Sequence, residues 1–337
     1  MIKEAIAQLV AGRSLSLNEA AIVMQEIMEG TATPAQFGAF VTALRLKGET
    51  IEEIAGLART MRAKALQVNI NEPVVDTCGT GGDGSGTFNI STAAAFVAAA
   101  CGLKIAKHGN RAMSSQCGSA DVLEALGVKI DMNPEQVKRC LENVGIGFML
   151  APVFHPAMKY AAAPRKEVGI RTVFNILGPL TNPAGAKAQV MGVPEKGLTE
   201  KMATVLKILG GKRALVVYGE DGLDEITITG TTFVSELKND NIINYEITPE
   251  EMGLKRAKSD TLKGGTAKEN AELLHRILSG KKGAQRDIVL MNASAALLAG
   301  DKVATLKQGI LMAGQAIENG SALKKMEELV KFSHNSD

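Results

Sequence analysis

Length, composition and charge exclude several classes of protein, since the chain has 337 residues, 45% hydrophobic and 22% charged, with 38 Lys and Arg against 36 Asp and Glu. This length favours two domains, no apolar run approaches the roughly 20 residues of a membrane span, and the near-zero net charge argues against a nucleic-acid partner. The four cysteines form no Cys-x-x-Cys pair, so we expect neither a zinc site nor a disulfide framework and place the protein in the reducing cytoplasm.

Residues 1–70 carry helix signals and no strand signal. Helices are expected over residues 2–10, 16–30, 33–48 and from residue 50 onward. Ser16 is followed three residues later by Glu19, the spacing of a capping box, and Thr50 begins a second such box. Thr33 is followed by Pro34, which is tolerated in the first turn of a helix. We therefore expect a small all-helical N-terminal domain.

From residue 73 onward, short β-branched runs alternate with Ala-rich helical stretches. Strands are expected at residues 74–75, 103–106, 146–150, 214–218 and 226–229, with a strand pair at 231–247 that turns at 239–241, and helices at 93–100, 119–126, 134–144, 267–278, 289–298 and 303–317. Such alternation is typical of α/β packing. The predicted fold class is therefore α/β, with a larger domain over residues 71–337 whose central sheet is mostly parallel.

The densest glycine signal lies in residues 76–92, between an expected strand and an expected helix. Gly79, Gly81 and Gly84 satisfy the dinucleotide pattern Gly-x-Gly-x-x-Gly literally. The helix starts several residues too late for that fold, however, and residues 95–110 contain no carboxylate to bind a ribose. A nucleotide P-loop is also excluded, because no Lys-Ser/Thr pair follows the last glycine.

The remaining interpretation of the glycines is a cradle for a phosphorylated ligand. Backbone N–H groups of the loop and the hydroxyls of Ser91 and Thr92 would line it at a helix N-terminus, whose partial positive charge favours phosphate. Polar residues from Lys107 to Ser119 follow the next expected strand. Because the carboxyl ends of parallel strands open at the same edge of a sheet, we expect these residues to converge on the cradle.

Seven sequence blocks together resemble the anthranilate phosphoribosyltransferase family. They occupy residues 79–83, 89–92, 107–111, 118–121, 165–172, 174–183 and 222–225, in order, so the resemblance spans essentially the whole chain. It implies a fold like that of nucleoside phosphorylases and phosphoribosyltransferases, with helices within about 165–183 completing the small domain, and a homodimer. It also implies transfer of the 5-phosphoribosyl group from phosphoribosyl pyrophosphate to the amine of anthranilate, with Mg²⁺, two ions per subunit, in tryptophan biosynthesis.

The same resemblance implies three sets of site residues. Phosphoribosyl pyrophosphate would contact Gly79, Gly82, Asp83, Thr87, Asn89, Ile90, Ser91, Thr92, Lys107, His108, Gly109, Asn110, Arg111, Ala112, Met113, Ser114, Ser115 and Ser119. The metal ligands would be Ser91, Asp224 and Glu225, and the anthranilate contacts would be Gly79, Asn110 and Arg165. Gln116 and Cys117 depart from the family's commoner Lys or Arg and Ser, which bears on the charge of that loop.

The chemistry of the reaction agrees with these assignments. Displacement at the ribose C1 has oxocarbenium character, so the protein must stabilise the departing anion and orient the nucleophile. An aromatic amine is neutral at pH 7 and needs no base, so no acid/base residue is assigned, His108 included. Arg165 offers a planar fork for the acceptor carboxylate, and the adjacent Asp224 and Glu225 suit Mg²⁺ bridged to phosphates. We expect the acceptor to bind in the cleft between the domains.

Two alternatives remain open from the sequence. A pyrimidine-nucleoside phosphorylase-like enzyme would share the glycine loop and a block like 107–111, but would lack the 89–92 block and the Asp224-Glu225 pair. A non-catalytic nucleic-acid-binding relative is opposed by the near-zero net charge and by the intact acceptor block around Arg165. The expected partners are therefore the two small-molecule substrates, with neither nucleic acid nor membrane.

Overall fold

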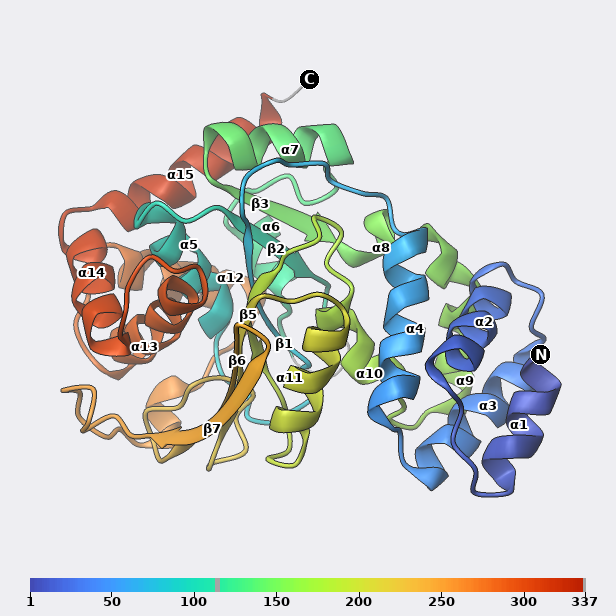
Figure 1. Cartoon of the computed structure of the whole chain (residues 1–337). Helices are drawn as coiled ribbons and strands as arrows, with labels where there is room; N and C mark the ends of the chain where they lie inside the picture. Colours follow the sequence, from blue (N-terminus) through green and yellow to red (C-terminus); the bar gives the residue numbers. More distant parts are fainter. Residues whose placement is uncertain (113–115, 336–337) are drawn as a thin grey trace.

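A helical unit lies beside a larger α/β unit in the computed structural model (Figure 1), which describes residues 1–112 and 116–335. The helical unit begins with α1 Ile2–Val10, α2 Leu17–Met28, α3 Pro34–Lys47 and α4 Ile51–Lys64. Ser16, Thr33 and Thr50 cap the last three of these, each in a complete capping box. Each box satisfies backbone N–H groups that the first helical turn leaves free, and the three helix starts expected from the sequence are confirmed.

Seven strands form one sheet within the described residues, in the order β3-β2-β1-β4-β5-β6-β7. Their bounds are β1 Val75–Gly79, β2 Ile105–Gly109, β3 Ile146–Leu150, β4 Ala188–Gly192, β5 Arg213–Gly219, β6 Thr232–Lys238 and β7 Asn241–Ile247. Strands β1 to β5 are parallel, and β6 and β7 extend the sheet as an antiparallel hairpin. The predicted α/β class with a mostly parallel sheet is confirmed.

Helices cover both faces of the sheet. Those of the α/β unit are α5 Ile90–Ala100, α6 Ser119–Ala125, α7 Pro134–Asn143, α11 Leu198–Ile208, α12 Ala267–Leu278, α13 Ala284–Ala299, α14 Leu306–Glu318 and α15 Ser321–His334, with a 3₁₀ turn at Ser259–Leu262. Alternate residues of β5 enter two different buried clusters. Leu215 and Val217 pack with α5 and α13, whereas Ala214 and Val216 pack with α11 and the helical unit. Burial on both faces is what parallel strands require.

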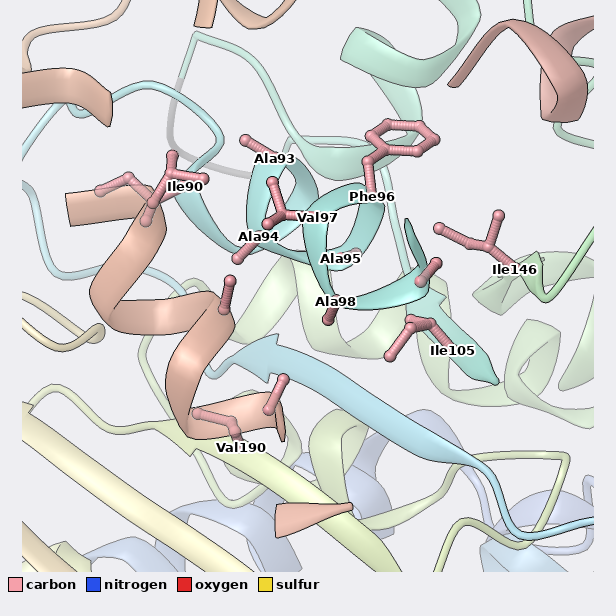
Figure 2. Close-up of a cluster of buried hydrophobic side chains, with 14 of the residues drawn as sticks. Ile90, Ala93, Ala94, Ala95, Phe96, Val97, Ala98, Ile105, Ile146 and Val190 are labelled. Atoms are coloured by element: carbon pink, nitrogen blue, oxygen red, sulfur yellow. The ribbon is translucent and has the colours of Figure 1, made fainter. Parts of the chain in front are cut away.

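Helix α5 is fully packed and fixes the start of the site. Figure 2 shows its alanine side chains in one cluster with Ile105 of β2 and Ile146 of β3. Residues 92–99 are all buried, and the small side chains of the alanines among them let α13 pack against α5. The N-terminus of α5, directly after the glycine-rich segment, is therefore held rigidly at one edge of the sheet.

The helical unit shares its buried cluster with later parts of the chain. These parts include α9 Lys159–Val168 and α10 Phe174–Leu177, with 3₁₀ turns at Pro156–Met158 and Gly178–Leu180, whereas α8 Ala151–Phe154 packs into the cluster of the α/β unit. The ring centroids of Phe37 and Phe174 lie 5.3 Å apart. Arg62 on α4 donates to the carbonyls of Leu180 and Leu209, at 2.5 and 3.0 Å. The division of the chain at residue 70 stays a prediction, because one buried cluster runs from α1 to β4 and β5.

The expected strand at residues 226–229 is wrong. The N–H and C=O groups of Ile226 bond to the side-chain amide of Asn292 on α13, at 3.0 and 2.9 Å, rather than to a neighbouring strand. Thr227 and Thr229 donate their hydroxyls to Asp221. The β-branched residues that suggested a strand therefore stabilise a loop through their side chains.

Strand β4 and helices α11 and α15 are present although the sequence did not predict them, whereas the predicted hairpin at residues 231–247 is confirmed. Strand β4 has the sequence Ala-Gln-Val-Met-Gly, without the β-branched run or alternation that marks a strand. In the turn between β6 and β7, Asn239 and Asp240 have φ of 49° and 63°, the positive values that a two-residue hairpin turn needs. Among the described residues, no helix combines the length and apolar character needed to cross a bilayer.

Candidate functional site

Two glycines meet at the carboxyl ends of β1 and β4. Strand order reverses between these strands, and in open α/β sheets such a reversal opens a crevice at the carboxyl edge. Gly79 and Gly192 are register partners there. A Cβ on Gly79 would lie 2.3 Å from Asp224 Oδ2, and a Cβ on Gly192 would lie 1.5 Å from the Asp224 carbonyl oxygen. The lack of a side chain at both positions therefore makes room for Asp224 in the crevice.

Three carboxylates gather beside this crevice. Asp224 is buried and accepts a 2.7 Å hydrogen bond from the Gly81 N–H, and Glu225 accepts a 3.0 Å bond from the Ser91 N–H. Burial raises the pKa of Asp224 well above its usual range, and the charges of Asp83 and Glu225 raise it further. Burial also raises the pKa of Glu225 to about 7. This excess of negative charge is one that a bound cation would relieve.

Lys107 lies at the floor of the crevice, on β2. Its side chain is buried, and Nζ donates to the Thr77 carbonyl and, at 3.3 Å, to Ser91 Oγ. Its neighbour His108 donates its backbone N–H to the buried carboxylate of Asp76 at 3.2 Å. Burial raises the pKa of Asp76 to about 6, against the opposing effect of the Lys107 charge. The end of β2 is thus fixed by buried polar contacts to β1.

The segment of residues 80–89, which we call the glycine loop, extends from the crevice. Its left-handed glycines are Gly81, Gly82, Gly84 and Gly86, with φ between 64° and 74°, a conformation that other residues adopt only with strain. Asp83 accepts hydrogen bonds from the N–H and hydroxyl of Ser85, at 3.1 and 2.7 Å. Thr87 pairs with Lys263 in an isolated bridge. The loop is therefore preformed, and all four of its glycines are exposed.

The N-terminus of α5, which the sequence predicts to bind phosphate, faces a carboxylate instead. Glu225 takes the Ser91 N–H, and a carboxylate there shows that this helix end attracts negative charge. Ile90 is buried, and the hydroxyl of Thr92 is buried without a partner among the described residues. A phosphate would therefore share this helix end with Glu225.

Asn89, directly before α5, joins the glycine loop to two other segments. Its Nδ2 donates to the Cys117 carbonyl at 3.1 Å, and its Oδ1 accepts from Asn270 of α12 at 3.0 Å. Cys117 directs its thiol at the same Oδ1, at 3.3 Å. The side chain of Asn89 is thus occupied by protein contacts.

The polar segment after β2 reaches the crevice only in part. Asn110 is exposed, and its carbonyl accepts from the Ser119 hydroxyl at 3.3 Å. The Arg111 guanidinium pairs with Asp121 and Glu124, at 3.0 and 2.7 Å, so it is not free for phosphate as the sequence suggests. Gly109 and Ala112 are partly buried. The predicted contacts Met113, Ser114 and Ser115 lie outside the described residues.

Two buried histidines lie at the end of β2. The ring centroids of His108 and His155 are 5.1 Å apart. Burial lowers the pKa of His108 to about 3 and that of His155 to about 4. His155 Nε2 lies 3.1 Å from the Thr181 carbonyl oxygen, whereas His108 Nε2 has no partner in the described part of the chain. Both rings are therefore neutral at pH 7.

Arg165, the predicted carboxylate-binding residue, lies on α9. Its side chain is partly buried, and burial lowers the pKa of its guanidinium. Within residues 1–112 and 116–335, its guanidinium has neither a hydrogen bond nor an ion pair, and burial is the one influence that shifts its pKa. A partly buried cation without a partner is poorly compensated, so this side chain is suited to bind a carboxylate.

Three residues that shape the site were not predicted as site residues from the sequence. Arg171 donates to the carbonyls of the glycine loop, and Asn182 donates to Asp76 at 2.7 Å. Asn292 holds the backbone of Ile226, directly after the carboxylate pair. Each of these contacts spans 66 or more residues, so no local pattern could indicate it. Only the family-like blocks at 165–172 and 174–183 include the first two.

The site has the donors for a magnesium ion but not a complete cage. No group of three or more His, Cys, Asp or Glu side chains in the described ranges is arranged to hold a metal. Mg²⁺ is commonly held by one or two carboxylates, with substrate phosphates and water completing the shell. Asp224, Glu225 and the Ser91 hydroxyl therefore fit an ion that binds together with a phosphorylated substrate.

Comparison with known proteins gives full-length matches. A family model described as "Glycosyl transferase family, helical bundle domain" matches residues 3–65, and one described as "Glycosyl transferase family, a/b domain" matches residues 71–323. Among curated relatives, the anthranilate phosphoribosyltransferase of Dehalococcoides mccartyi strain CBDB1 is 59% identical, over 99% of each chain. That of Acetivibrio thermocellus is 58% identical, over 99% of this chain and 97% of the relative.

Solved structures match as completely. The crystal structure of the anthranilate phosphoribosyltransferase of Thermus thermophilus has a TM-score of 0.93 and 46% identity, and the match covers 98% of this chain and 99% of that one. The Saccharomyces cerevisiae enzyme in complex with PRPP (phosphoribosyl pyrophosphate) and Mg has a TM-score of 0.90 and 30% identity, covering 99% and 98%. Another structure of the yeast enzyme contains 4-fluoroanthranilate.

Proposed function

Since this chain belongs to the anthranilate phosphoribosyltransferase family, we propose that the crevice between β1 and β4 is its active site. The enzyme transfers the 5-phosphoribosyl group from phosphoribosyl pyrophosphate to the amine of anthranilate, giving N-(5-phosphoribosyl)anthranilate and pyrophosphate, in tryptophan biosynthesis. One observation carries the assignment of the site: Asp224, Glu225 and Lys107 converge with the glycine loop where strand order reverses. An anionic substrate that carries its own cation fits this combination.

The donor is proposed to lie along the carboxyl edge of β1 and β2. Its contacts would be Gly79, Gly82, Asp83, Thr87, Asn89, Ile90, Ser91, Thr92, Lys107, His108, Gly109, Asn110, Arg111, Ala112, Met113, Ser114, Ser115 and Ser119. Lys107 is buried beside Ser91 Oγ, so its ammonium is placed to stabilise the negative charge that develops on the departing pyrophosphate. Arg111 would have to exchange Asp121 and Glu124 for phosphate to contribute.

Ser91, Asp224 and Glu225 are proposed as magnesium ligands. When bound, Mg²⁺ neutralises part of the pyrophosphate charge and orients the leaving group. Asp224 and Glu225 are held by different backbone amides, those of Gly81 and Ser91, so their carboxylates have separate positions. This separation supports two ions per subunit.

The acceptor is proposed to bind on the α9 side of the crevice. Arg165 would pair with the anthranilate carboxylate, with Asn110 and Gly79 as further contacts. As the bond from C1 to the amine nitrogen forms, the bond from C1 to the pyrophosphate oxygen breaks, and the amine loses a proton to water. The protein's task is orientation and exclusion of competing water, since the neutral amine is already nucleophilic. The buried neutral rings of His108 and His155 take no acid/base role in this scheme.

A homodimer formed through the helical unit is also proposed. Val10 on α1 and Leu46 on α3 have 74% and 82% of their surface exposed, whereas Leu9 is buried. Helices α1 and α3 pack against each other, so exposed apolar groups lie on neighbouring helices. We also propose a cytoplasmic location, which the free thiols of all four cysteines support.

The experiment that tests the proposed function is direct. Purified protein with phosphoribosyl pyrophosphate, Mg²⁺ and anthranilate should consume anthranilate fluorescence and form phosphoribosylanthranilate, identified by mass. The same protein should not cleave a pyrimidine nucleoside with phosphate, nor bind DNA in a salt-dependent manner. Phosphorolysis of a nucleoside with anthranilate left unchanged would favour the alternative enzyme class.

A further inference from the structure

We propose that Arg171 is a positioning residue that couples the acceptor side of the site to the donor side by orienting the peptide groups of the glycine loop. The inference rests on the proposed function of the crevice. Arg171 is exposed and lies outside the strands and helices, so neither burial nor regular secondary structure fixes the position of its guanidinium. It nevertheless donates two hydrogen bonds to two successive carbonyls of the glycine loop, across 89 and 90 residues of sequence.

The contact is bidentate and close. Nη1 donates to the Gly82 carbonyl at 2.6 Å, and Nη2 donates to the Gly81 carbonyl at 3.1 Å. A Cβ on Gly82 would lie 2.1 Å from Nη1, so the guanidinium occupies the space that any side chain would take. The planar fork of arginine suits two neighbouring acceptors, which a lysine ammonium could not bind in the same way.

The orientation of the carbonyls fixes the orientation of the amides. In a trans peptide the C=O and the following N–H point in opposite directions. With the Gly81 and Gly82 carbonyls directed at Arg171, the N–H groups of Gly82 and Asp83 are directed away from it. Neither N–H has a hydrogen-bond partner in the described part of the chain, and the preceding N–H, of Gly81, already binds Asp224. Successive free amides of this kind form an anion-binding concavity.

Arg171 also belongs to the acceptor side of the molecule. It follows the left-handed Gly169, with φ of 68°, that ends α9, and Arg165 lies on the last turns of that helix. On its other side, the Thr172 N–H is fixed by Asn175 Oδ1 at 3.0 Å. The segment between is short, so any shift of α9 on binding anthranilate would be transmitted to the guanidinium and to the loop carbonyls.

Two buried hydroxyls lie at the junction between the glycine loop and the segment after α9. Thr80 precedes Gly81, and Thr172 follows Arg171. Each has a buried hydroxyl oxygen without a hydrogen-bond partner in the residues that the structure describes. Buried polar groups are otherwise almost always bonded, so these two hydroxyls are available to bond a substrate group or a water molecule at the junction.

The test uses two variants that remove the contact in different ways. Arg171→Ala removes the fork, and Gly82→Ala keeps the arginine but places a Cβ 2.1 Å from it. Gly84→Ala is the matched control for Gly82→Ala, because Gly84 has a similar φ of 70° but nothing within 4 Å of its Cβ. Arg276→Ala on α12, at an exposed position, controls for the loss of a surface charge.

Calorimetric titration with phosphoribosyl pyrophosphate and Mg²⁺ should show weakening by about tenfold or more in Arg171→Ala, the size expected for hydrogen bonds from a charged donor. Gly82→Ala should weaken the donor more than Gly84→Ala does, and Arg171→Lys should recover only part of the loss. The melting temperature should stay near that of Arg276→Ala. In the parent enzyme the apparent KM of the donor should depend on the anthranilate concentration, and in Arg171→Ala this dependence should disappear.

Unchanged donor affinity in Arg171→Ala, in an enzyme that still forms phosphoribosylanthranilate, would overturn the inference while leaving the proposed function intact. A melting temperature that falls in proportion to the affinity would reduce Arg171 to a structural contact. A rise confined to the anthranilate KM would make it an acceptor ligand. Failure of the parent protein to form the product would instead refute the proposed function itself.

Discussion

Replacing Gly192 by alanine tests whether the glycines at the ends of β1 and β4 make room for Asp224. The alanine side chain must displace the backbone that carries the carboxylates of Asp224 and Glu225. The new Cβ would lie 1.5 Å from the Asp224 carbonyl oxygen and 2.2 Å from its carbonyl carbon. Cβ contacts under 3.0 Å essentially do not occur, so one partner must move by about 3.0 − 1.5, or 1.5 Å. Both contacts are to backbone, so no side-chain rotation can relieve them.

Two magnitudes follow from this displacement. Overpacking of this kind costs about 1–3 kcal/mol, and replacing Gly by Ala returns about 0.4–1 kcal/mol by restricting the unfolded chain. The midpoints of these ranges leave Gly192→Ala about 1.3 kcal/mol less stable than the parent. Magnesium accepts little variation around ligand distances of about 2.0–2.1 Å, and a misplacement of about 1 Å can reduce activity by about 10²-fold. We therefore expect kcat/KM to fall by about 10²-fold and activity to require a higher concentration of Mg²⁺ than in the parent.

Urea unfolding measures the change in the free energy of unfolding. Anthranilate fluorescence at a series of Mg²⁺ concentrations measures the change in activity and in its dependence on Mg²⁺. Gly197→Ala is the control, because Gly197 has helical φ and ψ of −64° and −13° and nothing within 4 Å of its Cβ. It should match the parent in activity and be equally stable or up to about 1 kcal/mol more stable. A Gly192→Ala enzyme with parental stability and parental Mg²⁺ dependence would refute the claim that the two glycines make room for Asp224.

Three further predictions concern charges in and near the crevice. Asp224→Asn combined with Glu225→Gln should abolish activity, and excess chelator should abolish the activity of the parent. The double variant should be at least as stable as the parent at pH 8, because the repulsion between the buried carboxylates is relieved. Activity in the double variant, or in the parent with excess chelator, would contradict the metal assignment. Arg165→Ala should raise the anthranilate KM, with a loss of binding free energy of about 2–5 kcal/mol, and leave the donor KM nearly unchanged. The anthranilate KM of Arg165→Lys should lie between those of the parent and Arg165→Ala. A raised donor KM with an unchanged anthranilate KM would place Arg165 at the phosphates. Burial lowers the pKa of His155 from 6.5 to about 4, so the contribution of its neutral ring to the free energy of unfolding is complete above pH 6.5 and is lost as the pH falls to 4, about 3 kcal/mol in all. In urea unfolding, the stability of His155→Gln should therefore fall less steeply than that of the parent between pH 6.5 and pH 4. An equally steep fall in both proteins would show that His155 is not buried as a neutral ring.

The sequence by itself determined the elements whose signals are local. A capping box joins a residue to the one three positions later, so Ser16 and Thr50 marked their helices without any tertiary information. The hairpin turn at Asn239 and Asp240 and the left-handed glycines of the glycine loop are likewise properties of neighbouring residues. The predicted mostly parallel sheet followed from the alternation of short strands and helices.

The tertiary structure alone decided which distant residues meet. Residues 226–229 have the composition of a strand, but Asn292 satisfies the backbone of Ile226 and leaves a loop. Strand β4 gave no clear signal, and yet its last residue, Gly192, is one of the two on which the position of Asp224 depends. Strand order sets such contacts, and strand order is not written in any local pattern.

The charge state of the site was also beyond the sequence. The adjacent Asp224 and Glu225 suggested a metal site from their type and spacing, but the raised pKa of each arises from burial and from neighbours such as Asp83, 141 positions before Asp224 in the chain (224 − 83). In the same way, Arg111 looks like a free phosphate ligand until α6 places Asp121 and Glu124 against it. Desolvation and pairing depend on three-dimensional surroundings, so the sequence could name the charged residues but not their partners.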